Sequence, residues 1–247
     1  MNIISTTLLT KSFGGNTAVN QVSIDIKEKQ CTGIIGTNGS GKTTLLNLIS
    51  GMLKADSGDV VYAGRTITNM PSHDRAMLGI ARSFQHINLF PNLTSLENVR
   101  LAVQAKRQKG FQIFSSHLKD KVCMERAMLH LEKVGLAGKA ALSSAVLTHG
   151  DKRKLELAMI LSQDPNVLLL DEPTAGMSVE EVPSILEILM GIKKEGDKTI
   201  VLVEHKMDFL LTIVDEVAVL LNGNMVAMDK PNVIMADEKV RTAYLGE

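Results

Sequence analysis

The 247-residue sequence has few of the residues that define specialised folds: two cysteines, no tryptophan and 3% aromatic residues. Cys31 and Cys123 are too few for a disulfide scaffold, and they are not spaced as metal ligands. Lys plus Arg total 27 and Asp plus Glu total 27, so the formal net charge is zero. Because nucleic-acid binding by bulk charge needs a basic surplus, we expect no nucleic-acid partner.

The sequence also lacks long apolar runs. None approaches the about 18 residues that a membrane-spanning helix needs. The first residues carry neither a basic segment nor an extended apolar stretch, so no secretory signal is expected. The expected location is the cytoplasm, and any work at a membrane would need another chain to cross it.

What is present is an alternation of short apolar strands with helical patterns, which indicates an α/β fold. Val22, Ile24 and Ile26 alternate with polar residues, as in a half-buried strand. Further strands are predicted at residues 31–35, 58–63, 167–170 and 199–203, and a hairpin at 217–221 and 225–228 across Asn222-Gly223-Asn224. We predict a mixed, mainly parallel sheet flanked by helices.

Between about residues 90 and 160 the pattern becomes helical. Leu96, Val99 and Val103 have helical spacing, and a second helical pattern ends at Gly135. We therefore interpret the 247 residues as one domain with a core at 1–90 and 160–247 and a helical subdomain at about 90–160. A helix over about 150–163 would be roughly 20 Å long at about 1.5 Å per residue.

A glycine-rich loop follows the strand at 31–35. Its spacing, Gly36-x-x-x-x-Gly41-Lys42-Thr43, matches the P-loop of nucleotide-binding proteins. Glycines let successive N–H groups turn toward a phosphate chain, and the following helix N-terminus favours anions. The alternative is a chance glycine-rich turn, but the strand before it and the helix after it favour the P-loop. The expected nucleotide contacts are Gly36, Thr37, Asn38, Gly39, Ser40, Gly41, Lys42, Thr43 and Thr44.

Two acidic residues and a histidine follow apolar strands. Asp171 is placed to hold Mg²⁺, and Glu172 to activate the attacking water. Taken alone, such a pair before Pro173 indicates a helix N-terminus. His205 follows the strand at 199–203 and is a candidate to contact the γ-phosphate and the water, although a lone histidine is more often structural.

Together these residues resemble the nucleotide-binding subunit of an ABC (ATP-binding cassette) transporter over nearly the whole chain. In that resemblance Phe13 stacks on adenine, 36–43 is Walker A, Gln85 is the Q-loop glutamine, and 167–171 is Walker B. The signature motif corresponds to Leu147-Thr148-His149-Gly150-Asp151, and His205 is the switch histidine. For Phe13, a core position is an equal alternative.

The resemblance implies ATP as substrate, Mg²⁺ held by Thr43, Gln85 and Asp171, and catalysis by Glu172 and His205. It implies a second cassette, as homodimer or heterodimer, whose ATP the signature residues Thr148, His149, Gly150 and Asp151 contact. It also implies transmembrane permease subunits, a substrate-binding protein, and a peripheral location on the inner face of the cell membrane. Ile87, Leu89 and Phe90 are candidates to receive a permease helix, with packing under the helical subdomain as the alternative.

A narrower resemblance, to importers of branched-chain amino acids or of urea and amides, rests on residues 81–91, 203–207 and 243–246. The ATPases of lipopolysaccharide export end similarly and are the alternative. ABC ATPases acting on DNA or ribosomes usually have two cassettes or a long coiled coil, which this sequence does not provide. A regulatory module without turnover is disfavoured because Glu172 and His205 fill the hydrolytic positions.

Two motifs depart from the family pattern. The usual signature is Leu-Ser-Gly-Gly-Gln, whereas here His149 replaces the first glycine and Asp151 the glutamine. Thr148 can still cap a helix and face a phosphate. Asp151 would repel a triphosphate unless its side chain points away. Ser178 stands where the D-loop usually has aspartate, which weakens the inference of a contact across the dimer there.

Overall fold

The computed structural model describes residues 1–83, 87–107, 121–238, 240 and 242. The chain divides into two compact units. The first contains Met1–Arg82, Asn166–Glu172 and Leu189–Glu247, and the second contains Ser83–Pro165 and Pro173–Ile188. The fold is that of an α/β protein, as the sequence predicts.

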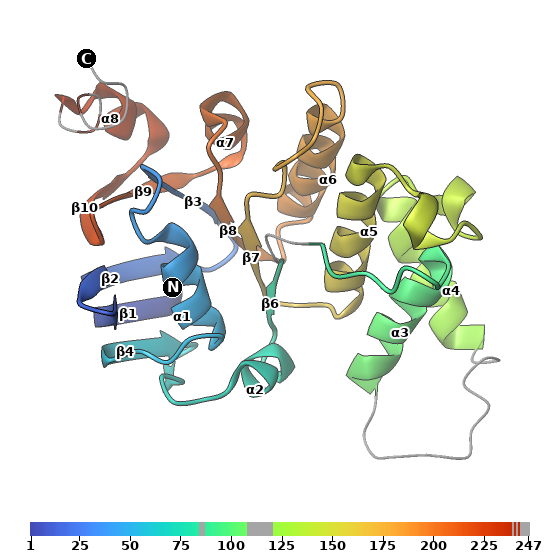
Figure 1. Cartoon of the computed structure of the whole chain (residues 1–247), viewed down its shortest axis with the longest axis horizontal. Helices are drawn as coiled ribbons and strands as arrows, with labels where there is room; N and C mark the ends of the chain where they lie inside the picture. Colours follow the sequence, from blue (N-terminus) through green and yellow to red (C-terminus); the bar gives the residue numbers. More distant parts are fainter. Residues whose placement is uncertain (84–86, 108–120, 239, 241, 243–247) are drawn as a thin grey trace. The chain divides into compact units, whose positions relative to one another are not determined.

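The first unit contains a six-stranded sheet in the order β10-β9-β3-β8-β7-β6 (Figure 1). Its pairs are parallel except β9 with β10, which form the predicted hairpin. Every residue of β3, β7 and β8 is buried, which explains why these strands are mostly apolar. The strands are β3 (Cys31–Gly36), β6 (Ile80–Arg82), β7 (Val167–Asp171), β8 (Thr199–Val203), β9 (Glu216–Leu221) and β10 (Asn224–Asp229).

A second sheet of the first unit is antiparallel, in the order β2-β1-β4-β5. Its strands are β1 (Asn2–Phe13), β2 (Asn16–Lys27), β4 (Ser57–Tyr62) and β5 (Arg65–Thr66). Val22, Ile24 and Ile26 of β2 are buried between exposed neighbours, as their alternation predicts. The sequence pattern did not indicate β1, which is the strand that joins β2 to β4.

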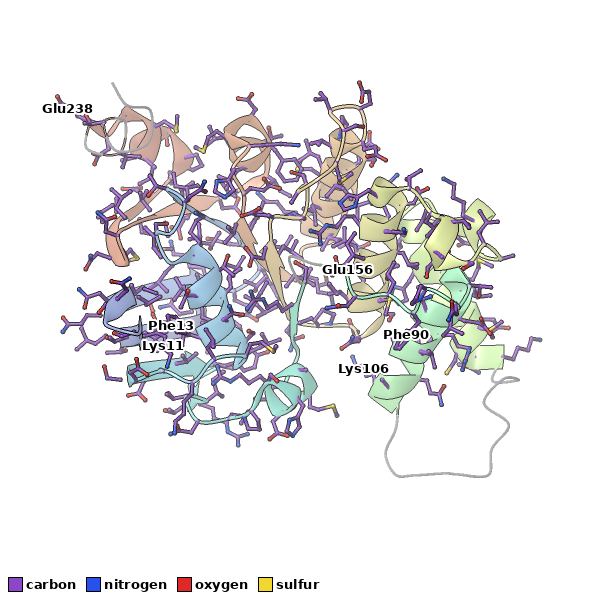
Figure 2. The ribbon with its side chains drawn as sticks, in the orientation of Figure 1. Lys11, Phe13, Phe90, Lys106, Glu156 and Glu238 are labelled. Carbon is purple, nitrogen blue, oxygen red and sulfur yellow. The ribbon has the colours of Figure 1, made fainter. Side chains whose placement is uncertain are left out.

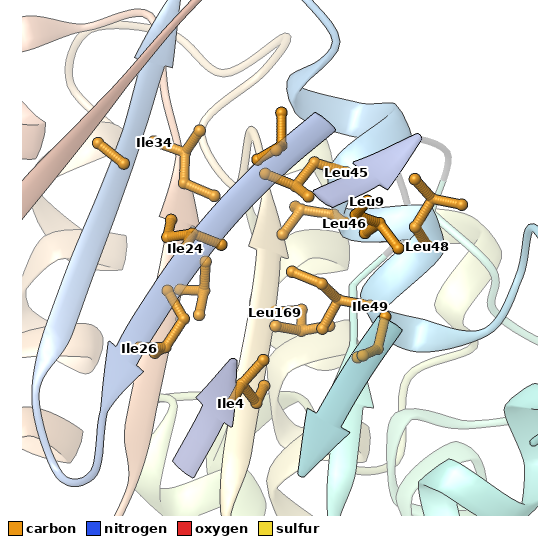
Figure 3. Packing of buried hydrophobic residues seen from close by; sticks show 14 of the residues in the cluster. Ile4, Leu9, Ile24, Ile26, Ile34, Leu45, Leu46, Leu48, Ile49 and Leu169 are labelled. Carbon is orange, nitrogen blue, oxygen red and sulfur yellow. The ribbon is translucent and has the colours of Figure 1, made fainter. Parts of the chain in front are cut away.

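Helix α1 (Lys42–Ser50) packs against strands of both sheets, and its apolar face forms the centre of the first unit's core. Figure 3 shows Leu45, Leu46 and Ile49 of this helix among isoleucines and leucines of both sheets. Burying each such side chain contributes about 1.5–3 kcal/mol. The described residues of this unit also form three shorter helices: α2 (Ser72–Met77), α7 (Met207–Ile213) and α8 (Pro231–Ala236).

The second unit is built around three mutually packed helices: α3 (Ser95–Arg107), α4 (Lys121–Lys133) and α5 (His149–Ser162). Helix α5 matches the helix expected at about 150–163. Two 3₁₀ turns, Ala137–Lys139 and Ser144–Val146, lie between α4 and α5. Helix α6 (Val182–Glu195) begins in this unit and ends in the first.

Candidate nucleotide-binding site

The P-loop runs from the end of β3 into the N-terminus of α1, as predicted. Gly41 takes φ 100° at the helix N-cap, and a Cβ there would lie 2.1 Å from the Ala18 carbonyl oxygen. A Cβ at Gly36 would lie 2.2 Å from the Leu220 carbonyl oxygen. Side chains at either position would therefore displace the loop from the strands behind it.

The hairpin turn between β9 and β10 holds this loop from behind. The Gly223 N–H donates to the Ser40 carbonyl (3.1 Å), and the Gly223 carbonyl accepts from the Asn20 N–H (2.8 Å). These two bonds connect the P-loop through the turn to β2. Thr37, Asn38 and Gly39 remain exposed at the loop tip, whereas Thr43 and Thr44 are partly buried in the first turn of α1.

Lys42 lies back across the P-loop. Its Nζ donates to the carbonyls of Gly36 (2.9 Å) and Thr37 (3.0 Å), and the residue is buried. Burial lowers the pKa of Lys42, partly opposed by the negative charges of Glu172 and Asp171. Because an ammonium group has three N–H donors, these two bonds leave one donor to offer to a phosphate. No acidic residue occupies the first turn of α1, so the helix N-terminus keeps its positive potential.

Asp171, fully buried at the end of β7, divides its two oxygens between two partners. Oδ1 accepts from Thr43 Oγ1 (3.3 Å), and Oδ2 lies 3.1 Å from Arg82 Nη2. Burial raises the pKa of Asp171, while the Arg82 charge and the Thr43 hydrogen bond lower it.

This donor set fits Mg²⁺, which proteins often hold through one or two carboxylates together with substrate phosphates. Thr43 and Asp171 place two hard oxygens side by side. Among the described residues no group of three or more His, Cys, Asp or Glu side chains could hold a metal ion by itself. Gln85, the other predicted ligand, lies outside the described residues.

Glu172 and His205 meet at the ends of β7 and β8. Glu172 takes φ 48°, a rare backbone angle for a side-chain-bearing residue, and its N–H donates to the Val203 carbonyl (2.9 Å). Its Oε1 lies 3.0 Å from His205 Nε2, with both side chains partly exposed. Because a carboxylate only accepts, Nε2 carries the proton in this pair.

Two supporting residues were not predicted from the sequence: Glu204 beside His205, and Arg82 beside Asp171. The buried Glu204 accepts from the backbone N–H groups of His205 (3.0 Å) and Lys206 (3.4 Å), which fixes the chain beside the histidine. Arg82 pairs with Asp171 although 89 residues separate them. Polar residues at strand ends were the available signal for Glu204, whereas no local pattern marks the arginine.

Phe13 lies at the end of β1 with 47% of its surface exposed, so the alternative of a core phenylalanine is wrong. Figure 2 shows Lys11 beside it, and Lys11 Nζ lies 5.5 Å from the ring centroid. A ring exposed in this way has a face to offer to a planar ligand. In the second unit Phe90 is also about half exposed, while Ile87 and Leu89 are partly buried.

The signature residues lie at the N-terminus of α5 in the second unit. Thr148 caps the helix, and its Oγ1 accepts from the Asp151 N–H (3.2 Å), as expected of a threonine there. Asp151 is buried, and its Oδ2 lies 2.5 Å from Nζ of Lys139, which lies in the first of the two 3₁₀ turns. The carboxylate is therefore neutralised within its own unit.

The other departures are also absorbed locally. His149 Nε2 donates to the Ala175 carbonyl (3.0 Å), and a Cβ at Gly176 would lie 2.9 Å from the same nitrogen. The Ser178 N–H donates to Glu181 Oε2 (3.3 Å), and a Cβ at Gly150 would lie 2.5 Å from Glu181 Oε1. Glycine at 150 thus lets Glu181 approach the helix.

Comparison with known proteins gives one consistent result. The family model described as "ABC transporter" matches residues 19–175. The high-affinity branched-chain amino acid transport ATP-binding protein LivG of Salmonella typhimurium is 34% identical over 95% of this chain and 94% of its own length. BraF of Pseudomonas aeruginosa, described in the same words, is 34% identical over 99% and 98%. The lipopolysaccharide export system ATP-binding protein LptB of Haemophilus influenzae is 29% identical over 100% and 98%.

Solved structures give the same result. A nucleotide-free ATP-binding cassette of an ABC transporter superposes with a TM-score of 0.86 at 29% identity, covering 100% of both chains. A cassette described in its ADP conformation gives 0.86 at 30% identity, also covering 100% of both. A dimeric bacterial cassette gives 0.80 at 26% identity over 92% of this chain and 98% of its own.

Proposed function

Because the chain belongs to the ABC transporter family, we propose that it binds and hydrolyses ATP to power a membrane transporter that imports branched-chain amino acids or related small polar solutes. The observation that carries the proposal is the convergence of Lys42, Asp171 and the Glu172–His205 pair at the ends of three adjacent parallel strands. Ligands of open α/β sheets bind at this edge.

In the proposed reaction, the side chains of the site divide phosphate binding, metal binding and proton transfer among them. The P-loop N–H groups, the α1 N-terminus and Lys42 bind the β- and γ-phosphates. Thr43 and Asp171, together with Gln85, would hold Mg²⁺, which when bound neutralises phosphate charge. Glu172 accepts a proton from the water that attacks the γ-phosphorus, and the bond from that phosphorus to the bridging oxygen of the β-phosphate breaks, which releases ADP and inorganic phosphate. His205, which donates to Glu172, orients that carboxylate and can donate instead to the γ-phosphate.

We further propose that the site is completed by a second cassette. In this arrangement Phe13 stacks on adenine, while Thr148, His149 and Gly150 face the ATP of the partner cassette. Asp151 does not repel that ATP, because Lys139 neutralises it. ATP then stabilises the closed dimer, and hydrolysis releases it, since a ligand shifts such an equilibrium only through its different affinity for the two states.

The permease subunits and a substrate-binding protein are the proposed remaining partners. Among the described residues no helix is both long and apolar enough to cross a bilayer. By analogy with relatives that are transport ATP-binding proteins, we propose that this chain lies at the inner face of the membrane, docked on the permease. Branched-chain amino acids are favoured over lipopolysaccharide because two amino-acid transport relatives are 34% identical and the lipopolysaccharide export relative is 29% identical.

The test is reconstitution in vesicles of the chain with its co-purified membrane subunits. We expect ATP-dependent uptake of labelled leucine that requires the binding protein and is lost in Glu172→Gln. ATP hydrolysis without uptake of any branched-chain amino acid would overturn the proposed identity of the transported substrate. Absence of hydrolysis in the assembled complex would overturn the ATPase function.

A further inference from the structure

Arg82 is a buried arginine next to the proposed metal site. It ends β6, and 7% of its side chain is exposed. Nη2 donates to Asp171 Oδ2 (3.1 Å), while Nη1 donates to Asn47 Oδ1 and to Ser50 Oγ (3.2 Å). The guanidinium therefore connects β7 to α1, the helix that follows the P-loop.

The bond to Arg82 leaves the two oxygens of Asp171 unequal. Oδ2 is directed to the guanidinium, and Oδ1 is directed to Thr43 Oγ1. Since the carboxylate is fully buried, rotating its plane would break its hydrogen bonds to Thr43 and Arg82 away from water, which is costly. Arg82 thus fixes the plane of the carboxylate so that one oxygen faces Thr43, and its charge compensates the buried carboxylate.

We propose that Arg82 is a positioning residue for the metal: it holds Asp171 so that Oδ1 and Thr43 Oγ1 form the metal-binding edge of the nucleotide site. This inference rests on the proposed function. Groups that orient metal ligands typically contribute about 10- to 100-fold in metal affinity. The opposing effect is repulsion between the guanidinium and the metal ion, which the Asp171 carboxylate between them reduces.

The experiment compares the affinity for ADP in excess Mg²⁺ with that in EDTA, measured by calorimetry on the full chain. The dissociation constant in EDTA divided by that in excess Mg²⁺ is a ratio that reports the metal site separately from phosphate binding. For Arg82→Met we expect this ratio to fall about tenfold while the affinity in EDTA changes less than about twofold. Arg82→Lys keeps the charge and one donor, so it should recover part of the ratio. Binding of Mn²⁺ with ADP, followed by paramagnetic resonance, should weaken in the same order.

Arg75 supplies a matched control. It is also a buried arginine next to α1, but it donates to the carbonyls of Leu48, Ile49, Thr68 and Met70. Arg75→Lys should lower the melting temperature without changing the ratio. If Arg82→Met does not fold, Asn47→Ala, which removes one of the contacts that hold the guanidinium, should show a smaller fall in the ratio.

The outcomes separate the two proposals. Wild-type chain that binds no ADP in either condition would overturn the proposed function. Wild-type chain whose ADP affinity does not depend on Mg²⁺ would overturn the inference alone. An unchanged or increased ratio in both Arg82→Met and Arg82→Lys would also overturn the inference, because charge repulsion would then equal or exceed the orientation effect. If Arg82→Met does not fold, an unchanged or increased ratio in Asn47→Ala would overturn it in the same way.

Discussion

The P-loop edge of the first unit and the N-terminus of α5 in the second unit use charge differently. In the first, Lys42 is held by carbonyls of its own loop, and the partly exposed Glu172 and His205 contact each other. In the second, Asp151 is buried against Lys139, and His149 contacts a backbone carbonyl. At α5 the charged and polar side chains that depart from the family pattern are therefore paired with groups of their own unit, whereas at the P-loop edge the catalytic candidates stay partly exposed.

The largest effect is expected at the P-loop edge, where Glu172 is the proposed base. Glu172→Gln keeps the size of the side chain and an oxygen that can accept from His205, but it removes the base. We expect hydrolysis by the assembled complex to fall about 10²- to 10⁴-fold with ATP binding retained, so that an ATP-bound dimer accumulates. Phosphate release and size-exclusion chromatography measure both. Glu216→Gln, in the same unit and paired with Lys27, is the control. Near-normal turnover in Glu172→Gln would exclude Glu172 as the base.

The next effect concerns binding. Lys42→Ala removes a charge-assisted hydrogen bond to phosphate, which contributes about 1.5–3 kcal/mol, so we expect nucleotide affinity to fall about 10- to 100-fold. Calorimetry with ADP measures it. Lys27→Ala, at an exposed position of the same unit, should leave affinity unchanged. An unaltered dissociation constant for Lys42→Ala would contradict the assignment of residues 36–43 as the phosphate site.

The two cysteines can sharpen the comparison, because each unit contains one. Cys31 is buried in β3, and burial raises its pKa to about 12, so thiol reagents should react only when the first unit opens. Cys123 is buried in α4 of the second unit. ADP at about 100 times its dissociation constant should slow labelling of Cys31 by up to about 100-fold.

Labelling of Cys123 should be little affected if nucleotide stabilises the first unit alone. The measurement is the labelling rate by mass spectrometry in Cys31→Ala and Cys123→Ala variants, each of which retains one thiol. Equal protection of both cysteines would show that the two units open cooperatively. The stability of one unit could then not be considered separately from that of the other.

The parts of the fold that could be predicted from sequence are those set by local rules. Strands buried on both faces have unbroken apolar sequences, so β7 and β8 were predicted to within a residue. The P-loop depends on glycine spacing, and the β9–β10 hairpin on Asn222-Gly223-Asn224. Each signal lies within a few residues of the structure that it predicts.

The missed parts depend on irregular backbone or distant contacts. In β1 the register shifts between Thr6 and Leu9, and Leu8 takes φ 48°, so the alternation that marks a strand is broken. The pairing of Arg82 with Asp171 and that of Lys139 with Asp151 join different segments, and no spacing rule identifies them. The sequence therefore indicated a risk of repulsion at Asp151 but could not identify the lysine that removes it.

The smallest expected effect tests the structural side of the comparison. Lys139→Ala removes the cation beside the buried Asp151 carboxylate, and because Lys139 is itself 45% exposed, solvent screening limits the loss of unfolding free energy to about 1 kcal/mol. Denaturant titration measures this loss, with Lys121→Ala, an exposed lysine of the same unit, as the control. The double variant Lys139→Ala/Asp151→Ala should regain part of the stability, because no unpaired charge is left buried. If Lys139→Ala instead weakened nucleotide binding tenfold at unchanged stability, the Lys139–Asp151 pair would contribute to nucleotide binding. The charges at α5 would then act on the ligand, as those at the P-loop are proposed to do.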